Sequence, residues 1–191
     1  MAYNIQSFIK HFIETYEGGL SLDPKDTGNW FGGTKVGSKY GVTGNALAAY
    51  RGVSKITAAD IANLSIDEAV NIGVKLYYKN PNFDLLPFDP VIASVIDMGW
   101  GAGPGQAIKL LQRIIGADDD GKIGQGTADA YKAYLQSHSL EQVAKAYQTA
   151  RYNFYDQIAR KNPDNLKFVK GWRNRTDGFM PGTPFWKAFY A

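Results

Sequence analysis

Apolar residues recur along most of the chain at the spacing of amphipathic helices. The clearest stripe begins at Ile5 and ends at Tyr16, with apolar side chains at i, i+3, i+4, i+7, i+8 and i+11. Gly18 and Gly19 follow at once and predict the end of this helix. Similar spacing predicts further helices near residues 43–50, 57–63, 65–78, 91–100, 107–115, 127–135 and 140–161, and one or two short helices after residue 163.

Residues 20–43 break the helical pattern. Glycine, aspartate, proline, asparagine and threonine dominate this stretch, and five glycines lie between Gly28 and Gly41. A loop of this length is usually functional or disordered, and the aromatic side chains of Trp30, Phe31 and Tyr40 favour an ordered lobe. The pattern therefore predicts a mainly α fold of the α+β kind, a helical bundle with a small irregular or β-hairpin lobe near residues 20–43.

Composition excludes several kinds of site. The chain has 191 residues and no cysteine, so it has no disulfide framework, no thiol nucleophile and no iron–sulfur cluster. With only His11 and His138, it cannot build a three-histidine metal site, and we expect no metal or organic cofactor. No run approaches the roughly 18 apolar residues of a membrane-spanning helix. The first residues lack a conventional signal peptide, so we expect synthesis in the cytoplasm and action after release or export.

The net charge of +3 is unevenly distributed. Residues 150–191 carry eight basic side chains against three aspartates, so their charge is +5 and that of the first 149 residues is −2. A basic segment favours an anionic partner such as nucleic acid, a membrane surface or a cell-wall polymer, although an ordinary soluble surface explains it equally well. No nucleic-acid-binding motif accompanies the charge, so we expect no nucleic-acid partner.

Glu17 has the strongest physical case for a chemical role. If the first helix continues through it, Glu17 lies at the edge of the apolar stripe and in the last turn, where the helix dipole disfavours a carboxylate. Both effects favour the protonated side chain, the form that a general acid needs. Asp23 and Asp26 follow in the glycine-rich lobe, and Thr43 offers a hydroxyl group that could hold a water molecule. An exposed Glu17 and aspartates that only form turns are the competing explanations.

The order of short motifs along the chain adds a resemblance. The motifs are Tyr16-Glu-Gly-Gly19, Asp23-Pro-Lys-Asp-Thr-Gly28, Gly32-Gly-Thr34, Gly41-Val-Thr43, Asp67-Glu68, Tyr77-Tyr78 and the run from Asp97 to Gly105. Together they resemble glycoside hydrolase family 108, the N-acetylmuramidases, which includes phage endolysins and secretion-activator proteins. Three later motifs are similar to the predicted peptidoglycan domain that follows in this family: Asp120-Gly-Lys-Ile-Gly124, Arg151-Tyr-Asn-Phe-Tyr155 and Phe168-Val-Lys-Gly-Trp-Arg-Asn-Arg175.

The resemblance implies a lysozyme-like protein that acts on bacterial peptidoglycan. It would cleave the β-1,4 bond between N-acetylmuramic acid and N-acetylglucosamine, with Glu17 as the general acid and Asp26, with Thr43, holding the attacking water. Paired carboxylates are what glycoside hydrolysis requires. We expect a catalytic region at residues 1–98 and a helical peptidoglycan-binding region at residues 99–191, packed as one compact monomer. The alternative is a wall-binding module without catalysis.

The chain departs from the family pattern at three places. Leu20 replaces a tyrosine, the segment between Gly28 and Gly41 is longer, and Gly101 stands where the family has an asparagine.

Aromatic rings near these motifs are candidates for stacking on sugars. The predicted substrate-binding residues are Trp30, Tyr40, Tyr78, Asp97 and Trp100. Aromatic rings in such positions are more often core residues than parts of a sugar-binding subsite. Arg151 falls on the apolar face of its helix, where a charge needs a partner, and Asp97 is the partner that we predict. The basic C-terminal region would add affinity for anionic cell-wall polymers.

Overall fold

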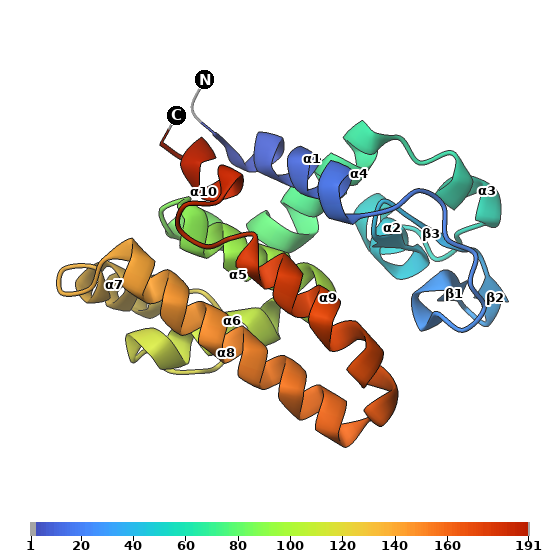
Figure 1. The fold of residues 1–191 in the computed structure, drawn as a ribbon. Helices are drawn as coiled ribbons and strands as arrows, with labels where there is room; N and C mark the ends of the chain where they lie inside the picture. Colours follow the sequence, from blue (N-terminus) through green and yellow to red (C-terminus); the bar gives the residue numbers. More distant parts are fainter. Residues whose placement is uncertain (1–2, 191) are drawn as a thin grey trace. The chain divides into compact units, whose positions relative to one another are not determined.

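The computed structural model describes residues 3–190 and is mainly helical, with two short antiparallel strand pairs (Figure 1). This confirms the predicted fold class.

Contacts divide the chain into two compact units, residues 4–80 and residues 81–190, and Tyr3 belongs to the second unit. The predicted division at residue 98 stays a prediction. None of the helices in residues 3–190 is long and apolar enough to cross a membrane.

The unit of residues 4–80 contains the glycine-rich lobe and the helices before and after it in the chain. Its elements are α1 (Ile5–Tyr16), η1 (Thr27–Asn29), β1 (Trp30–Phe31), β2 (Thr34–Lys35), β3 (Ser38–Lys39), β4 (Val42–Thr43), α2 (Gly44–Arg51), α3 (Ala58–Ala62), α4 (Ile66–Gly73) and η2 (Val74–Lys79). Strand β1 pairs with β2 and β3 with β4, both antiparallel. The lobe therefore consists of two hairpins.

Helix α1 forms as its sequence predicts. The side chain of Asn4 accepts a hydrogen bond from the backbone N–H of Ser7, and Ser7 Oγ accepts one from the backbone N–H of Asn4. This capping box satisfies two N–H groups that the first turn leaves unpaired. The middle of the apolar stripe is buried, at Phe8, Ile9, Phe12 and Ile13, whereas Tyr16 at its end is exposed. The helix packs against α4.

Helix α4 does not continue as an α-helix to residue 78, as the spacing predicts. After Gly73 the chain enters η2, a π-helical stretch. The N–H of Asn80 donates to the carbonyl oxygen of Lys75, five residues earlier, at 2.9 Å. A π-turn contains more residues than an α-turn, so side chains after Gly73 face other directions than a 3.6-residue period predicts.

The unit of residues 81–190 is a helical bundle around a buried central helix. Its elements are η3 (Phe83–Leu85), α5 (Pro90–Ala102), α6 (Pro104–Ile115), α7 (Gln125–Tyr134), α8 (Leu140–Lys161), η4 (Pro163–Asn165), α9 (Leu166–Asp177) and α10 (Pro184–Ala188). Every residue of α5 from Pro90 to Gly99 is buried. Helices α8 and α9 form a hairpin through η4 (Figure 1).

A buried ion-pair network joins α5, α8 and α9. Arg151 is 1% exposed, and its Nη2 donates to Asp97 Oδ2 at 2.7 Å. Its other N–H groups donate to Ser94 and to the Tyr155 hydroxyl, while Arg175 Nε donates to Asp97 Oδ1 at 2.9 Å. The predicted Arg151–Asp97 pair is confirmed. Burial opposes the charge of Arg151, but Asp97 together with the hydroxyl groups of Tyr155 and Tyr147 outweighs burial and raises the arginine pKa.

Tyr3 packs among aromatic rings near the end of the chain. Its ring lies edge-on to Phe185 and Phe189, with centroids 5.8 and 5.0 Å away. Phe189 also contacts Phe88, before α5. Burial raises the pKa of Tyr3 to about 12.

Asp89 is a carboxylate enclosed at the start of α5. Its Oδ1 accepts a hydrogen bond from the N–H of Ile92 at 2.9 Å, which makes it the N-cap, and its Oδ2 accepts one from the Tyr131 hydroxyl at 2.9 Å. Burial outweighs these bonds and raises the pKa of Asp89 from 3.8 to about 6. At neutral pH the helix therefore carries a buried charge that reduces stability.

We expect Asp89→Asn to change how stability depends on pH. The raised pKa means that the folded parent takes up a proton that the unfolded chain does not, so this residue adds stability as the pH falls from 7 toward 4. Its contribution between pH 7 and 4.5 is about 2 kcal/mol. Asparagine keeps the cap without ionising, so the variant should lose this gain and be more stable than the parent at pH 7.

Urea unfolding at pH 7 and at pH 4.5 measures the effect. Asp164→Asn, at an exposed position, is the control and should follow the parent at both values. Equal pH dependence in the parent and in Asp89→Asn would contradict the expectation.

Candidate active site

Glu17 stands directly after the last residue of α1. The helix ends at Tyr16, and Glu17 is its C-cap with an extended backbone, φ −101° and ψ 125°, whose N–H donates to Ile13. The prediction that Glu17 lies in the last helical turn is therefore wrong, because the chain leaves the helix one residue earlier. Glu17 is half-buried and remains beside the negative end of the helix dipole.

Tyr77 of η2 lies near the Glu17 carboxylate. Burial raises the pKa of Tyr77, and the negative charge of Glu17 raises it further. Helices α1 and η2 are in contact within the same unit. Sequence reasoning chose Tyr78 rather than Tyr77 as a substrate-binding residue; both rings are half-buried.

The two glycines after Glu17 lead the chain onto the second hairpin. Gly18 accepts a backbone hydrogen bond from Tyr40 at 3.1 Å, and Ser21 exchanges two backbone bonds with Ser38. Tyr40 and Gly41 form the turn between β3 and β4, with φ values of 54° and 71°. Two positive φ angles are typical of a type I′ hairpin, but a tyrosine pays about 1–2 kcal/mol for this conformation. The turn thus holds Tyr40 close to the segment that follows Glu17.

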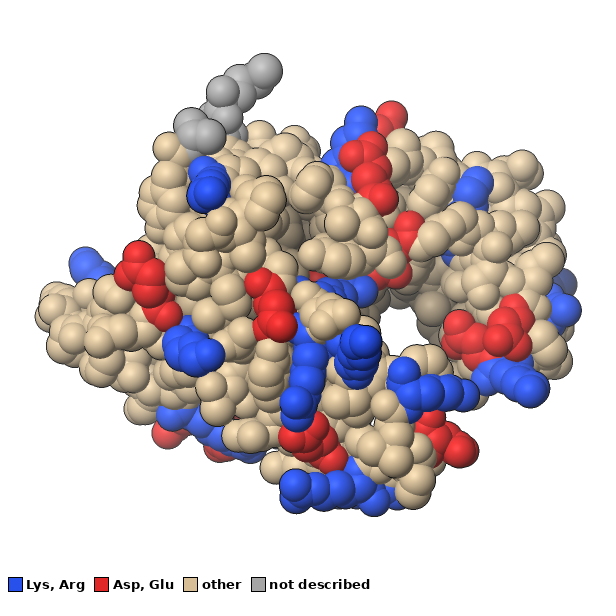
Figure 2. Space-filling view, viewed as in Figure 1, with Lys and Arg blue, Asp and Glu red and all other residues tan. Residues whose placement is uncertain are grey.

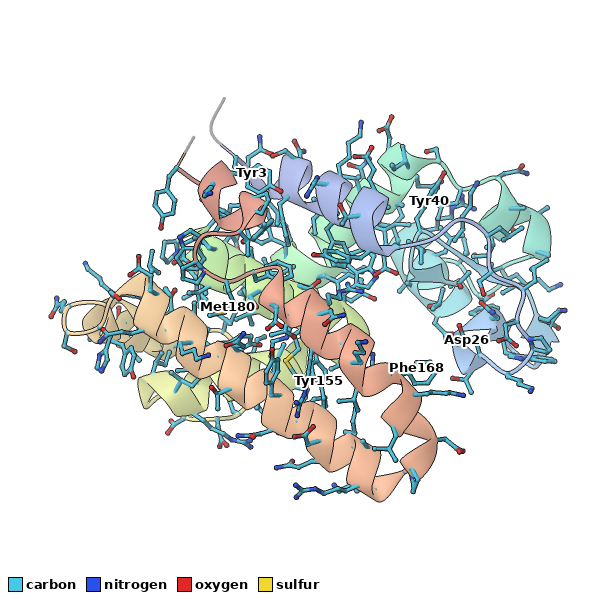
Figure 3. All side chains as sticks on the ribbon, in the orientation of Figure 1. Tyr3, Asp26, Tyr40, Tyr155, Phe168 and Met180 are labelled. Carbon is cyan, nitrogen blue, oxygen red and sulfur yellow. The ribbon has the colours of Figure 1, made fainter. Side chains whose placement is uncertain are left out.

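Asp26 and Thr43 both lie close to Gly28. A Cβ atom at Gly28 would be 3.2 Å from Asp26 Oδ1 and 3.2 Å from Thr43 Cγ2. Asp26 Oδ1 accepts a hydrogen bond from the N–H of Gly28 at 2.8 Å, and Thr43 Oγ1 accepts one from Ala46 at 3.3 Å. Asp26 is exposed in the lobe (Figure 3). The structure therefore brings these two predicted residues together.

Asp23 forms a separate turn. Its Oδ1 accepts a hydrogen bond from the N–H of Lys25 at 2.9 Å, and its side chain is exposed. Trp30, a predicted substrate-binding residue, is 40% exposed, and its Nε1 donates to Pro24 at 3.0 Å. Its ring is thus fixed against the lobe while part of its surface stays open to solvent.

Asn29 organises the lobe, and sequence reasoning missed it. The side chain is fully buried, and its Nδ2 donates to Ser21 and to the carbonyl oxygen of Asp23. Its backbone N–H donates to Asp26, and its carbonyl oxygen accepts from Val36 and Gly37. Asparagine is common in glycine-rich turns, so no signal in the sequence distinguished it.

Two predicted substrate-binding residues lie in the other unit, on α5. Asp97 has both carboxylate oxygens bound to arginines and a side chain with no exposed surface. In that position it supports the helices and does not present a surface to a polymer. Trp100 is half-buried. Among residues 3–190, no group of three histidine, aspartate or glutamate side chains could hold a metal ion.

Comparisons with known proteins agree with the order of the motifs. Residues 11–103 match the family model described as glycosyl hydrolase 108, and residues 106–177 match the model described as predicted peptidoglycan domain. The chain is similar to a solved structure described as Brucella abortus SagA, with a TM-score of 0.68 and 25% identity, over 92% of this chain and 96% of that chain. The comparison with curated proteins found no match.

The two matched regions follow each other in the order that the motifs predict, and Glu17, Asp26 and Thr43 all lie in the first. The chain therefore contains a glycosyl hydrolase 108 region followed by a predicted peptidoglycan domain, and it is a peptidoglycan hydrolase.

Proposed function

We propose that this protein is a lysozyme-type N-acetylmuramidase. It cleaves the β-1,4 bond between N-acetylmuramic acid and N-acetylglucosamine, and Glu17 donates the proton to the leaving oxygen. The proposal is carried by the position of Glu17 directly after α1, where the next residue, Gly18, accepts a backbone hydrogen bond from Tyr40. This bond connects the residue after Glu17 to the hairpin that ends in Thr43.

Asp26 and Thr43 are the proposed partners of the attacking water. The N–H of Gly28 occupies Asp26 Oδ1, so Oδ2 is the oxygen that would accept a proton from water. Thr43 Oγ1 accepts its hydrogen bond from Ala46 as an N-cap, and a hydroxyl group that accepts can also donate. An ionised carboxylate beside a hydroxyl group can orient a water molecule as glycoside hydrolysis requires. Trp30, Tyr40 and Tyr78 are the proposed rings for sugar binding.

The basic C-terminal segment is proposed to bind anionic wall polymers. Three of its arginines have structural roles, because Arg151 and Arg175 are paired with Asp97 and Arg173 is paired with Asp156. Arg160, Lys161 and Lys170 are exposed, and several basic side chains lie along the α8–α9 hairpin (Figure 2). These three supply long-range attraction rather than chemistry.

Glu17→Gln should lower the rate of wall lysis at least 100-fold, because the amide cannot donate the required proton. Binding to intact walls should stay within about twofold, since the shape is conserved. Loss of turbidity of a wall suspension measures the rate, and analysis of the new reducing end identifies the bond. Glu14→Gln, on the exposed side of α1, is the matched control. A rate above a tenth of the parent, about 1.4 kcal/mol in the barrier, would be too high for loss of the proton donor.

A parent protein that binds walls but produces no new reducing end would instead support the non-catalytic module. A glucosamine reducing end or a freed peptide amine would show that another bond is cut.

Asp26→Asn should reduce turnover about 100-fold without weakening wall binding, because it removes the charge and keeps the turn acceptor. Asp23→Asn is the matched control, since Asp23 caps a similar turn in the same lobe. It should retain activity close to that of the parent. The reverse result, an active Asp26→Asn and an inactive Asp23→Asn, would assign the role to Asp23.

Neutralising the exposed basic residues should weaken wall association at low salt only. The triple variant Arg160→Gln, Lys161→Gln, Lys170→Gln should bind several-fold less at 0.05 M salt and like the parent at about 1 M, where the Debye length falls to about 3 Å. The control removes the same charge from three scattered exposed sites, Lys55, Lys122 and Lys132. An equal loss in both triple variants would show that only net charge matters.

A further inference from the structure

The unit of residues 81–190 contains a cavity of about 180 Å³ enclosed by α5, α8 and α9. Its floor consists of buried side chains, among them Met98, Arg151 and Tyr155. Its rim is formed by the half-buried rings of Phe154 and Trp172 and by the exposed backbone of Gly101. The cavity is therefore open to solvent on the side of Gly101 and Trp172.

An aromatic series leads out of this cavity to the surface. The rings of Tyr155 and Trp172 are 5.2 Å apart and tilted by 34°, and those of Trp172 and Phe168 are 5.8 Å apart and tilted by 32°. Tyr155 comes from α8 and is 7% exposed, whereas Phe168 comes from α9 and is 47% exposed (Figure 3). Exposed aromatic rings beside a preformed cavity are typical of small-molecule sites.

The size and chemistry of the cavity limit what can enter it. A cavity of 150 Å³ can hold a benzene molecule, so this one has room for one small substituent and not for a disaccharide. The N–H donors of Arg151 are all used, and Asp97 binds both Arg151 and Arg175, so one carboxylate faces two guanidinium groups and the lining keeps one positive charge. A cation is therefore disfavoured there, and a neutral group with an apolar end fits the apolar side chains of the lining.

We infer that this cavity is a subsite for one N-acetylated sugar of the glycan strand, with the acetamido methyl group in the cavity and the sugar ring on Trp172 and Phe168. The inference rests on the proposed function for its polymer. It adds a recognition element within residues 81–190, separate from the chemistry assigned to Glu17, Asp26 and Thr43. The subsite would discriminate acetylated from deacetylated glycan.

A substitution at Gly101 can fill the cavity and so test whether it binds the sugar. It lies three and four residues after Met98 and Asp97 on α5, so a side chain there would point toward the same face. A Cβ atom at Gly101 would meet nothing within 4 Å. Leucine should therefore extend into the cavity without a clash, and it is also a better helix former than glycine. Gly101→Ala is the matched control, because it stabilises the helix without filling the space.

The experiment uses the full chain with Glu17→Gln, so that the probe is not cut. The probes are a tetramer of N-acetylglucosamine and the fully deacetylated tetramer. Calorimetry should show that Gly101→Leu weakens binding of the acetylated probe at least tenfold and that Gly101→Ala changes it less than twofold. The deacetylated probe should bind at least tenfold more weakly than the acetylated probe to the parent, and its affinity should not respond to Gly101→Leu.

The fluorine NMR signal of Trp172 shows whether the probe binds at this cavity. With fluorinated tryptophan, the resonance of Trp172, assigned with Trp172→Phe, should shift on addition of the acetylated tetramer in the parent and not in Gly101→Leu. Equal affinities of the leucine and alanine variants, or a Trp172 shift caused only by stem peptide, would overturn the subsite. Thermal unfolding of each variant confirms that it folds. The proposed function is tested by the lysis rate of Glu17→Gln, whereas the subsite is tested by probe binding. Either can therefore be contradicted without the other.

Discussion

The guanidinium group of Arg151 is the constraint on which the helical bundle of residues 81–190 depends. Taking an arginine charge out of water costs several kcal/mol, and this cost is offset only when every donor has a partner. Here the partners come from α5 and from α8 itself, and Arg175 of α9 binds the other oxygen of Asp97. Small displacements of these helices would leave donors unpaired in the interior. The cavity whose floor includes Arg151 is therefore rigid before any ligand arrives.

The lobe of residues 20–43 is held by a different kind of interaction. Its strands are only two residues long, and an isolated short hairpin is marginally stable in water. The fully buried Asn29 compensates, because its amide and backbone bind Ser21, Asp23, Asp26 and the start of the second hairpin. The position of Asp26 thus depends on Asn29, three residues away, whose backbone N–H binds the carbonyl oxygen of Asp26. Helices α2 and α3 of the same unit also contact the lobe.

The sequence predicted features that follow from local periodicity or from the cost of burial. The apolar stripe of α1 and the need for a partner at Arg151 are of this kind, and both predictions are confirmed. The end of α1 was predicted one residue too late, because the apolar periodicity does not show at which residue before Gly18 the backbone leaves the helix. The π-helical η2, with Tyr77 beside Glu17, depends on packing that no periodic pattern describes. The cavity near Gly101 was not visible either, because α5 forms one wall and α8 and α9, much later in the chain, form the other; Asp97 and Arg151, for example, are 54 residues apart.

The packing of Tyr3 against Phe185 and Phe189 has a consequence for the folding pathway. Apart from Tyr3, the described part of this bundle consists of residues 81–190. In the sequence, the unit of residues 4–80 is therefore inserted between two parts of the same bundle. During synthesis these residues leave the ribosome before residues 81–190 and can acquire their structure early, while the contact of Tyr3 must wait until Phe185 and Phe189 have been made. An interaction formed this late contributes little to the folding rate, and its stabilisation appears mainly as slower unfolding.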